Sequence, residues 1–369
     1  MSRPATCTTR PRDTRWRMAE PPVKGGAALA EVSGLNVRFV TREATVHAVN
    51  GVSFRVQPGE VLCILGESGS GKTVTLRALM RLLPPRRTQI TGNVRVDGQD
   101  VLAMPPRALR DLRGGLVAMI FQEPMTALDP VYTVGQQIGE TVRRHTGCDR
   151  LAARKRALEL LELVRIPSAE RRLDAYPHEL SGGLRQRAMI AMALSCKPRL
   201  LLADEPTTAL DATVQVQVLI LLRRLQRELG MGMIFVTHDL GVAAEIADTV
   251  AVMYAGRIVE SGPVAQILSA PAHPYTAGLL ASTVHGQSRD RDIDAISGSP
   301  PDMRRLPQGC SFAPRCTRRM AECRLVIPEP RFPAPGHMAA CHAVADGFPA
   351  TQVANTSTVS GSRATISAR

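Results

Sequence analysis

The spacing of apolar residues predicts strands in two parts of the chain. Apolar and polar residues alternate in LNVRFV and VHAVNGVSFRV, and EVLCIL follows, all within residues 31–65; such alternation is typical of strands. We expect turns between these strands at Thr41–Ala44 and at Pro58-Gly59. Farther along, RLLLAD (199–204) and GMIFVTH (232–238) are continuous apolar runs, which indicate parallel strands buried on both faces.

Helices are predicted between these strands. One should run from Gly71 to about Leu83 and end at Pro84-Pro85, because proline cannot continue a helix. Residues 133–195 are rich in Ala, Leu, Arg and Glu, with apolar residues at helical spacing in RALELLELV. The stretch VQVQVLILLRRLQREL, between the two apolar strands, predicts a helix of about four turns. Alternating strands and helices indicate an α/β fold with a parallel sheet.

Charge is concentrated at the two ends of the chain. The net charge is +13; residues 1–30 hold six basic and two acidic side chains, and residues 288–369 hold eleven and seven, so each end carries +4. No single basic stripe is therefore expected along a domain. Aromatic residues make up only 3%, too few for a surface on which bases stack. We expect no nucleic-acid partner.

The chain shows no segment typical of membrane insertion or secretion. Its apolar runs are far shorter than the ~18 residues that a membrane span needs. The N-terminus carries arginines but lacks the apolar region of a secretory signal, so we expect a cytosolic protein. Residues 1–30 form a basic tail without hydrophobic periodicity, and residues 348–369 form a second polar tail; both are predicted to be disordered.

A glycine-rich loop follows the strand EVLCIL. Its sequence, GESGSGKT (66–73), matches G-x-x-x-x-G-K-[ST] between a strand and a helix. The glycines let backbone N–H groups turn toward an anion, and the helix N-terminus adds partial positive charge. Lys72 supplies an ammonium group for the β- and γ-phosphates, and Thr73 a hydroxyl for Mg²⁺. The predicted ATP-binding residues of the loop are Gly66, Ser68, Gly69, Ser70, Gly71, Lys72 and Thr73.

Two carboxylates stand at the end of the apolar run 199–204. Asp204 ends the run and Glu205 follows it. Because side chains alternate along a strand, the two carboxylates diverge. We expect Asp204 to meet Mg²⁺ and Glu205 to polarise the water that attacks the γ-phosphate.

A second glycine-containing segment, LSGGLRQR (180–187), carries a family resemblance. Its Ser-Gly-Gly opens a helix and so offers another N-terminus that can bind an anion. Together with the glycine-rich loop, it resembles the nucleotide-binding subunits of ABC transporters over about residues 31–285. The resemblance implies a P-loop NTPase with a RecA-like parallel sheet core, an antiparallel β subdomain and a helical subdomain at about residues 123–197.

The resemblance also implies the roles of residues outside the loop. Gln122 resembles the glutamine that touches Mg²⁺ and the attacking water, and His238 resembles the histidine that contacts the γ-phosphate. Asp211, in ALD (209–211), resembles the D-loop aspartate. Phe39 lies where the family keeps an aromatic residue that stacks on adenine, although a core phenylalanine on a strand is an alternative. The signature residues, which would clamp ATP held by the opposite subunit of a head-to-tail dimer, are Ser181, Gly182, Gly183 and Gln186.

Longer segments resemble one group within this family. FQEPMTALDP, HELSGG, AHPYTAGLL (272–280) and GSPPDMRRLPQGCSFAPRC (298–316) resemble the ATP-binding subunits of dipeptide, oligopeptide and nickel importers. The resemblance implies two transmembrane permease subunits, a second ATPase subunit, identical or paralogous, and, indirectly, an extracytoplasmic solute-binding protein. It places the chain peripherally at the cytoplasmic face of the inner membrane. The expected function is ATP hydrolysis that energises uptake of di- or oligopeptides, with nickel or another small solute as the alternative.

Two other classes of protein are alternatives to a transporter subunit. Soluble ABC ATPases that act on ribosomes usually carry two cassettes, and those that act on DNA carry a long coiled-coil insertion. This chain has one P-loop, and the 107 residues between Lys72 and Leu180 hold no long heptad run. A regulatory module without catalysis is disfavoured by the presence of Glu205 and His238.

A cysteine cluster lies in the predicted C-terminal extension, residues 286–347. The gaps between successive cysteines are five, six and seventeen residues. Four thiolates can hold an iron–sulfur cluster or zinc, although the absence of a C-x-x-C pair weakens zinc. Some importers of the resembled group carry an iron–sulfur cluster on such cysteines, so we expect one here, with zinc or free thiols as alternatives. The residues concerned are Cys310, Cys316, Cys323 and Cys341.

Overall fold

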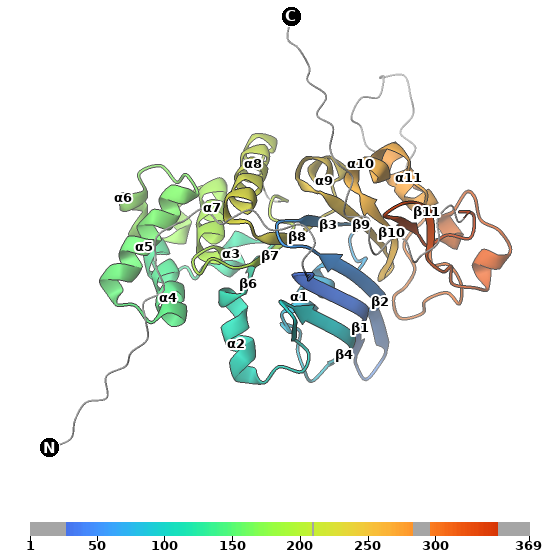
Figure 1. The fold of residues 1–369 in the computed structure, drawn as a ribbon, viewed down its shortest axis with the longest axis horizontal. Helices are drawn as coiled ribbons and strands as arrows, with labels where there is room; N and C mark the ends of the chain where they lie inside the picture. The colour runs from blue at the N-terminus through green and yellow to red at the C-terminus, as the bar shows by residue number, and fades with distance from the viewer. Residues whose placement is uncertain (1–26, 209, 283–295, 346–369) are drawn as a thin grey trace, which may run out of the picture.

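The computed structural model describes residues 27–208, 210–282 and 296–345. The tails predicted to be disordered fall outside these ranges, apart from residues 27–30. Figure 1 shows two sheets in the middle of the molecule, a group of helices at one end and the C-terminal extension at the other.

An eight-stranded sheet forms the centre of the molecule, in the order β11-β12-β10-β9-β3-β8-β7-β6. The strands from β9 to β6 run parallel, and β10 runs antiparallel to β9. The α/β fold with a parallel core, predicted from the apolar runs, is thereby confirmed. The bounds are β3 Val61–Leu65, β6 Val117–Ile120, β7 Leu200–Asp204, β8 Gly232–Thr237, β9 Thr249–Tyr254 and β10 Arg257–Pro263.

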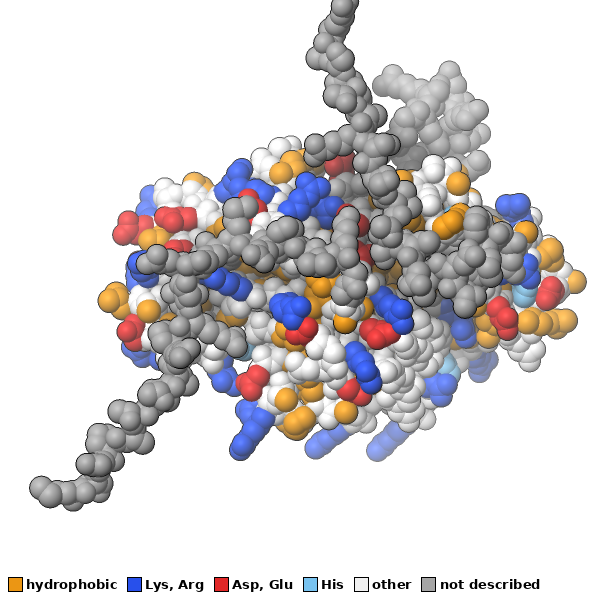
Figure 2. All heavy atoms as spheres, viewed as in Figure 1, with side chains coloured by type: hydrophobic (Ala, Val, Ile, Leu, Met, Phe, Trp, Pro, Cys, Tyr) orange, Lys and Arg blue, Asp and Glu red, His pale blue; other side chains and the backbone are white. Residues whose placement is uncertain are grey.

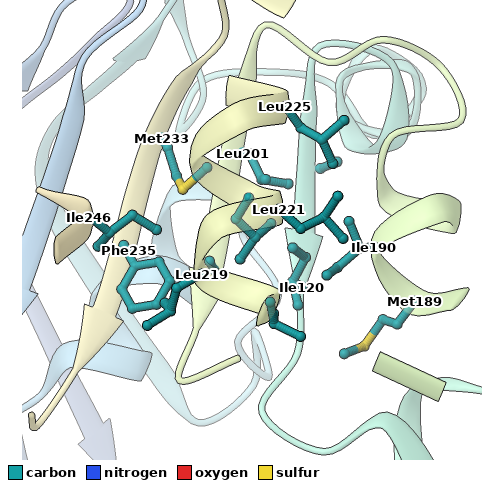
Figure 3. Close-up of a cluster of buried hydrophobic side chains, with 14 of the residues drawn as sticks. Ile120, Met189, Ile190, Leu201, Leu219, Leu221, Leu225, Met233, Phe235 and Ile246 are labelled. Atoms are coloured by element: carbon teal, nitrogen blue, oxygen red, sulfur yellow. The ribbon is translucent and has the colours of Figure 1, made fainter. Parts of the chain in front are cut away.

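The central strands are buried on both faces. Alternate residues of each strand enter two separate hydrophobic clusters: in β3, Cys63 belongs to one cluster, whereas Leu62 and Ile64 belong to the other. Figure 3 shows the first cluster, where α8 (Ala212–Leu229) lays Leu221 and Leu225 over the strands. Two-sided burial explains why these strands are continuous apolar runs rather than alternating ones.

The second cluster joins this sheet to a four-stranded antiparallel sheet of order β2-β1-β4-β5. Between the sheets lies α1 (Lys72–Leu79), which ends earlier than the expected Leu83. The backbone of Arg81 is left-handed, with φ of 49°, and the N–H of Leu82 donates to the carbonyl of Arg77; this cap stops the helix before the prolines. The strands are β1 Ala30–Val40, β2 Thr45–Val56, β4 Thr88–Val96 and β5 Gln99–Asp100.

Helices occupy the chain between β6 and β7, at the left of Figure 1. Their apolar faces pack into the first hydrophobic cluster. They are α3 Pro124–Ala127, α4 Val134–Thr146, α5 Arg150–Leu163, α6 Ala169–Leu173, the 3-10 turn η1 Pro177–Glu179 and α7 Gly182–Ala193. The remaining helices are α2 Pro106–Gly115, α9 Leu240–Ile246, α10 Val264–Ser269 and α11 Pro274–Ala281. No helix within the described ranges is both long enough and apolar enough to span a membrane.

The C-terminal extension is continuous with the central sheet, a feature that the sequence did not predict. Its strand β12 (His337–Ala339) pairs antiparallel with β10, and β11 (Arg331–Ala334) adds the outermost strand. Two 3-10 turns, η2 Ala313–Arg315 and η3 Glu322–Arg324, precede these strands. Figure 2 shows basic and acidic side chains interspersed over the face of the molecule in view.

Candidate functional site

The glycine-rich loop joins the central strand β3 to α1. Gly66, Gly69 and Gly71 have φ of 157°, 78° and 101°. A Cβ atom at Gly66 or Gly71 would collide with the backbone carbonyl of Met253 or Ala48, respectively. Neighbouring backbone therefore requires glycine at both ends of the loop, which curves tightly around the N-terminus of α1.

Lys72 and Ser70 lie buried in this loop. Lys72 Nζ donates to the carbonyl oxygens of Gly66 at 2.7 Å and Glu67 at 2.9 Å. Burial lowers the pKa of Lys72, an effect that the carboxylates of Glu205 and Asp204 oppose. Ser70 Oγ is buried without a hydrogen-bond partner in the described part of the chain. Anionic oxygens entering the loop could accept from both groups, so the loop fits a phosphate.

Thr73 and Asp204 meet beside the loop. Thr73 Oγ1 donates to Asp204 Oδ1 at 2.8 Å. Burial raises the pKa of Asp204, while the hydrogen bond from Thr73 and the charges of Arg77 and Lys72 act in the opposite direction. Hydroxyl and carboxylate oxygens are the ligands that Mg²⁺ prefers. The pair therefore fits a magnesium ion adjoining a phosphate in the loop.

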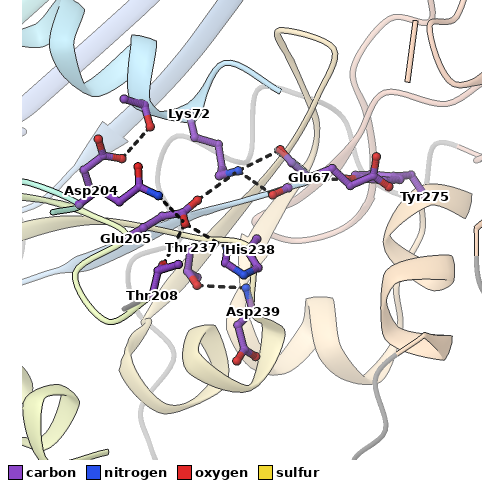
Figure 4. A network of polar contacts seen from close by, with 12 residues as sticks. Glu67, Lys72, Asp204, Glu205, Thr208, Thr237, His238, Asp239 and Tyr275 are labelled. Carbon is purple, nitrogen blue, oxygen red and sulfur yellow. Dashed lines mark hydrogen bonds and ion pairs between the residues drawn. The ribbon is translucent and has the colours of Figure 1, made fainter. Parts of the chain in front are cut away.

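Glu205 brings the other predicted catalytic side chains together. Its Oε2 lies 3.1 Å from His238 Nδ1 and 3.5 Å from Gln122 Nε2, and its Oε1 lies 3.8 Å from Lys72 Nζ. The backbone of Glu205 is left-handed, with φ of 44°, which is uncommon for a residue with a side chain. Figure 4 shows the carboxylate pointing toward Lys72 and His238, whereas Asp204 points to the other side.

Two features of the site were missed in the sequence. Thr208 Oγ1 donates to Glu205 Oε2 at 3.0 Å. In the sequence, only the spacing of three residues between Glu205 and Thr208 could have indicated this hydrogen bond. The backbone N–H of Glu67 donates to Tyr275 Oη at 3.0 Å, and Glu67 Oε2 accepts from Arg315 Nη1 at 2.9 Å. These partners lie 208 and 248 residues away along the chain, so no local pattern could reveal them.

The signature segment forms the exposed N-terminus of α7. Ser181 is the N-cap, and its Oγ accepts from the N–H of Leu184 at 3.4 Å. Ser181 and Gly182 are exposed, so the start of this 12-residue helix is accessible from solvent. A Cβ at Gly183 would lie only 2.7 Å from Val214 Cγ1 at the start of α8, so glycine is required by packing there.

The structure also gives the surroundings of three other predicted site residues, Gln186, Asp211 and Phe39. Gln186 is only 1% exposed, and its Nε2 is buried without a hydrogen-bond partner in the described part of the chain; its contact with a nucleotide on another subunit stays a prediction. Asp211 is the N-cap of α8 and accepts from the N–H of Val214 at 3.0 Å. Phe39 packs against the second hydrophobic cluster and stays partly exposed, so its stacking on adenine stays a prediction.

The four cysteines of the extension lie near one another. Burial raises the pKa of Cys310, Cys316 and Cys341, and neighbouring cysteines add to the rise. All four, including Cys323, are free thiols. Within the described ranges, no group of three or more His, Cys, Asp or Glu side chains is placed to hold a metal ion. This geometry does not support the predicted iron–sulfur cluster, nor the zinc alternative.

Comparison with known proteins agrees with this arrangement. A family model described as ABC transporter matches residues 49–208, and one for the C-terminal region of oligopeptide/dipeptide transporters matches residues 259–323. A putative peptide import ATP-binding protein of Brucella melitensis is 51% identical over 312 residues, covering 81% of this chain and 92% of the relative. A protein of the same description from Brucella ovis is 50% identical over 312 residues, with the same coverage.

Solved structures with a similar fold include an ATP-binding cassette and a part of an ABC transporter complex. One is a dimeric cassette in a post-hydrolysis state bound to ADP and Pi, with a TM-score of 0.58 and 27% identity over 64% of this chain and 98% of its own. The other is cbiO1 from Clostridium perfringens, part of the ABC transporter complex cbiONQ, with a TM-score of 0.56 and 27% identity over 66% of this chain and 91% of its own.

Proposed function

Because this chain belongs to the ATP-binding proteins of ABC transporters, of the group with the oligopeptide/dipeptide transporter C-terminal region, we propose that it hydrolyses ATP to drive peptide uptake through separate permease subunits. The observation that carries the proposal is the convergence of Lys72, Gln122 and His238 on the Glu205 carboxylate beside the phosphate loop. The similarity to peptide import proteins favours di- or oligopeptides over nickel as the transported solute.

The phosphate loop binds ATP in this proposal. The β- and γ-phosphates replace the loop carbonyls as partners of Lys72 Nζ, and Ser70 Oγ gains the acceptor that it lacks in the described residues. Gly66, Ser68, Gly69 and Gly71 supply the curved backbone, as the sequence predicts. Phe39 has an accessible part on which adenine would stack.

Thr73 and Asp204 hold Mg²⁺, with Gln122 as a further ligand. The ion supplies charge neutralisation between the phosphates. Glu205 accepts a proton from the attacking water, and Lys72 and His238 hold its carboxylate in position. His238 contributes the contact with the γ-phosphate.

A second copy or a paralogous subunit completes the site. Ser181, Gly182 and Gly183 open α7, and in this proposal they bind the γ-phosphate of ATP on the opposite subunit, together with Asp211 at the start of α8. The dimeric state of the similar cassette supports a head-to-tail pair. Gln186, whose Nε2 has no hydrogen-bond partner among the described residues, belongs to this clamp as the sequence predicts.

The permease contact in this proposal lies at the start of the helical group. Four large apolar side chains are exposed within a stretch of twelve residues: Phe121, Met125, Val131 and Tyr132. Exposed apolar residues are usually scattered singly, so a group of four indicates a contact surface. The segment 121–130 joins β6 to the helices and can pass motion from the ATP site to a permease. We accordingly place the chain at the cytoplasmic face of the inner membrane, with a solute-binding protein acting indirectly from the other side.

The decisive experiment changes Glu205→Gln, which keeps the side-chain shape but removes the proton acceptor. The variant should bind ATP normally, hydrolyse it on the order of 100-fold more slowly and accumulate as an ATP-bound dimer. Nucleotide affinity, phosphate release and size-exclusion chromatography with Mg-ATP measure the three effects. Normal turnover in this variant would show that another residue activates the water.

A metal at the four cysteines stays a separate proposal. The proposal is supported by the presence of four neighbouring thiols in one small extension. Within the described residues these thiols are not arranged as metal ligands. Protein purified without oxygen should be assayed for iron, sulfide and zinc, with Cys316→Ser as the control. Iron and sulfide that are lost in the control support a cluster; four titratable thiols without metal reject it.

A further inference from the structure

The C-terminal extension contacts the phosphate loop through one ion pair. Arg315 Nη1 lies 2.9 Å from Glu67 Oε2, and the two side chains are 6% and 26% exposed. Glu67 is the residue that follows Gly66 in the loop, at a position that the phosphate-binding pattern leaves open. The extension therefore reaches the nucleotide site itself rather than only the edge of the sheet.

Several contacts fix the guanidinium of Arg315. Nε donates to the carbonyl of Ser297 at 3.1 Å, and Nη2 donates to the carbonyl of Ile296 at 3.2 Å. The guanidinium carbon also lies 5.8 Å from the centre of the Tyr254 ring, close enough for a cation–π interaction. Phe312, three residues earlier, meets the same ring edge-on at 5.2 Å. Arg315 is thus a preorganised charge with little freedom left to lose.

Glu67 links this charge to the groups that bind phosphate. Its backbone N–H donates to Tyr275 Oη at 3.0 Å, and its carbonyl accepts from Lys72 Nζ at 2.9 Å. A displacement of Glu67 therefore moves a peptide group that contacts Lys72. An unpaired carboxylate at this position would also repel the phosphates, and with little solvent to screen it the repulsion would be strong.

We propose that Arg315 is a positioning residue for nucleotide binding, which neutralises Glu67 and holds the loop 66–73 in shape for phosphate. This rests on the proposed function, since it requires that the loop bind ATP. The C-terminal extension then supports the nucleotide site, and its detachment weakens ATP binding.

The first test changes Arg315→Gln in the full chain. The dissociation constant for Mg-ATP should rise on the order of 10-fold, and KM should rise more than kcat falls, because the chemistry at Glu205 is untouched. Arg315→Lys, which keeps the charge but not the planar fork, should restore part of the affinity. Arg319→Gln is the matched control, since Arg319 is an exposed arginine of the same extension, and it should bind ATP like the wild type.

The second test separates positioning from simple anchoring of the extension. Adding Glu67→Gln to the Arg315→Gln variant removes the uncompensated carboxylate, so ATP affinity should return to within about 3-fold of wild type. If Arg315 only anchored the extension, the double variant would bind ATP no better than Arg315→Gln alone, and the proposal would be overturned. Unchanged affinity in Arg315→Gln would overturn it as well.

A failure of the proposed function has a different signature. It would appear as a wild-type chain that does not bind Mg-ATP, or as a Lys72→Ala variant that binds it equally well. Wild-type binding that is lost in Lys72→Ala but unaffected in Arg315→Gln leaves the function standing and rejects the role of Arg315 alone.

Discussion

The nucleotide-binding core and the C-terminal extension are held together in different ways. Strands β3, β6, β7 and β8 are buried along their whole length between two large hydrophobic clusters. The extension, by contrast, has few buried apolar side chains, among them Phe312 and Ala339. In the core the burial free energy is spread over many neighbours, whereas in the extension a few contacts each carry a large share.

The contacts that hold the extension are specific and well separated. Phe312 joins Tyr254 and Tyr275 in an aromatic cluster, with ring centroids 5.2 Å and 5.3 Å away. On β12, His337 Nε2 lies 2.6 Å from the buried Glu260 Oε1 of β10. Together with Arg315, these contacts tie the extension to the sheet, to α11 and to the phosphate loop. Because so few contacts hold the extension, a single substitution can detach it from the sheet. The core, with many more contacts, would tolerate the loss of one.

The largest expected effect comes from Lys72→Ala and is confined to the core. Removing the ammonium should weaken ATP binding on the order of 1,000-fold, or about 4 kcal/mol, because the phosphates lose their buried charged partner. The extension should stay attached, since none of the contacts named above involves this side chain. Isothermal titration with ATP measures the loss, and amide exchange checks the extension. Lys155→Ala, on the exposed face of α5, is the control and should leave affinity unchanged.

Phe312→Ala should destabilise the extension and leave the core intact. Truncating this buried ring leaves a cavity against two tyrosines and should destabilise the extension by about 3 kcal/mol. Amide exchange should accelerate across residues 296–345 but not in β3 or β8, which share the first cluster with Phe312 but are also packed on their other face by the second cluster. Leu325→Ala, at an exposed site of the same extension, should exchange like the wild type. Equal acceleration in the core would show that the two regions unfold as one unit.

The smallest effect concerns the junction between the regions and depends on pH. Burial lowers the pKa of His273 to about 4, against the nearby charge of Glu260. The unfolded chain, with a pKa of about 6.5 for histidine, takes up the proton first. Stability from the neutral side chain is therefore complete above pH ~6.5 and is lost as the pH falls toward ~4. Between pH 7 and pH 5 the loss should be roughly 2 kcal/mol.

A His273→Asn variant isolates this contribution. His273 Nδ1 accepts from the N–H of Tyr275 at the start of α11, a capping role that asparagine can also fill. The variant should lose less stability than the wild type between pH 7 and pH 5, as measured by urea unfolding at both values. An identical loss in both proteins would mean that other groups govern the acid response.

Local spacing was enough to predict the strands, the helix and the loop that carry the candidate site. The loop 66–73 lies between a strand and a helix, as its pattern requires, and the apolar runs at 199–204 and 232–238 became adjacent parallel strands. Parallel order in turn brings the ends of β7 and β8 side by side, so Glu205 and His238 meet. These features follow from short-range periodicity and from the rule that buried parallel strands share one edge.

Local sequence patterns are therefore enough to predict the core fold, the phosphate loop and the residues at the strand ends. The tertiary structure alone decided which side chains became inaccessible and which distant segments met. Gln186 became buried with the packed face of α7, and four free cysteines gathered in one small extension. The strands of the extension formed only because the edge of β10 offered them partners. The contact between Arg315 and Glu67 spans 248 residues, and no local pattern encodes a pairing that exists only once both segments have packed against the same sheet.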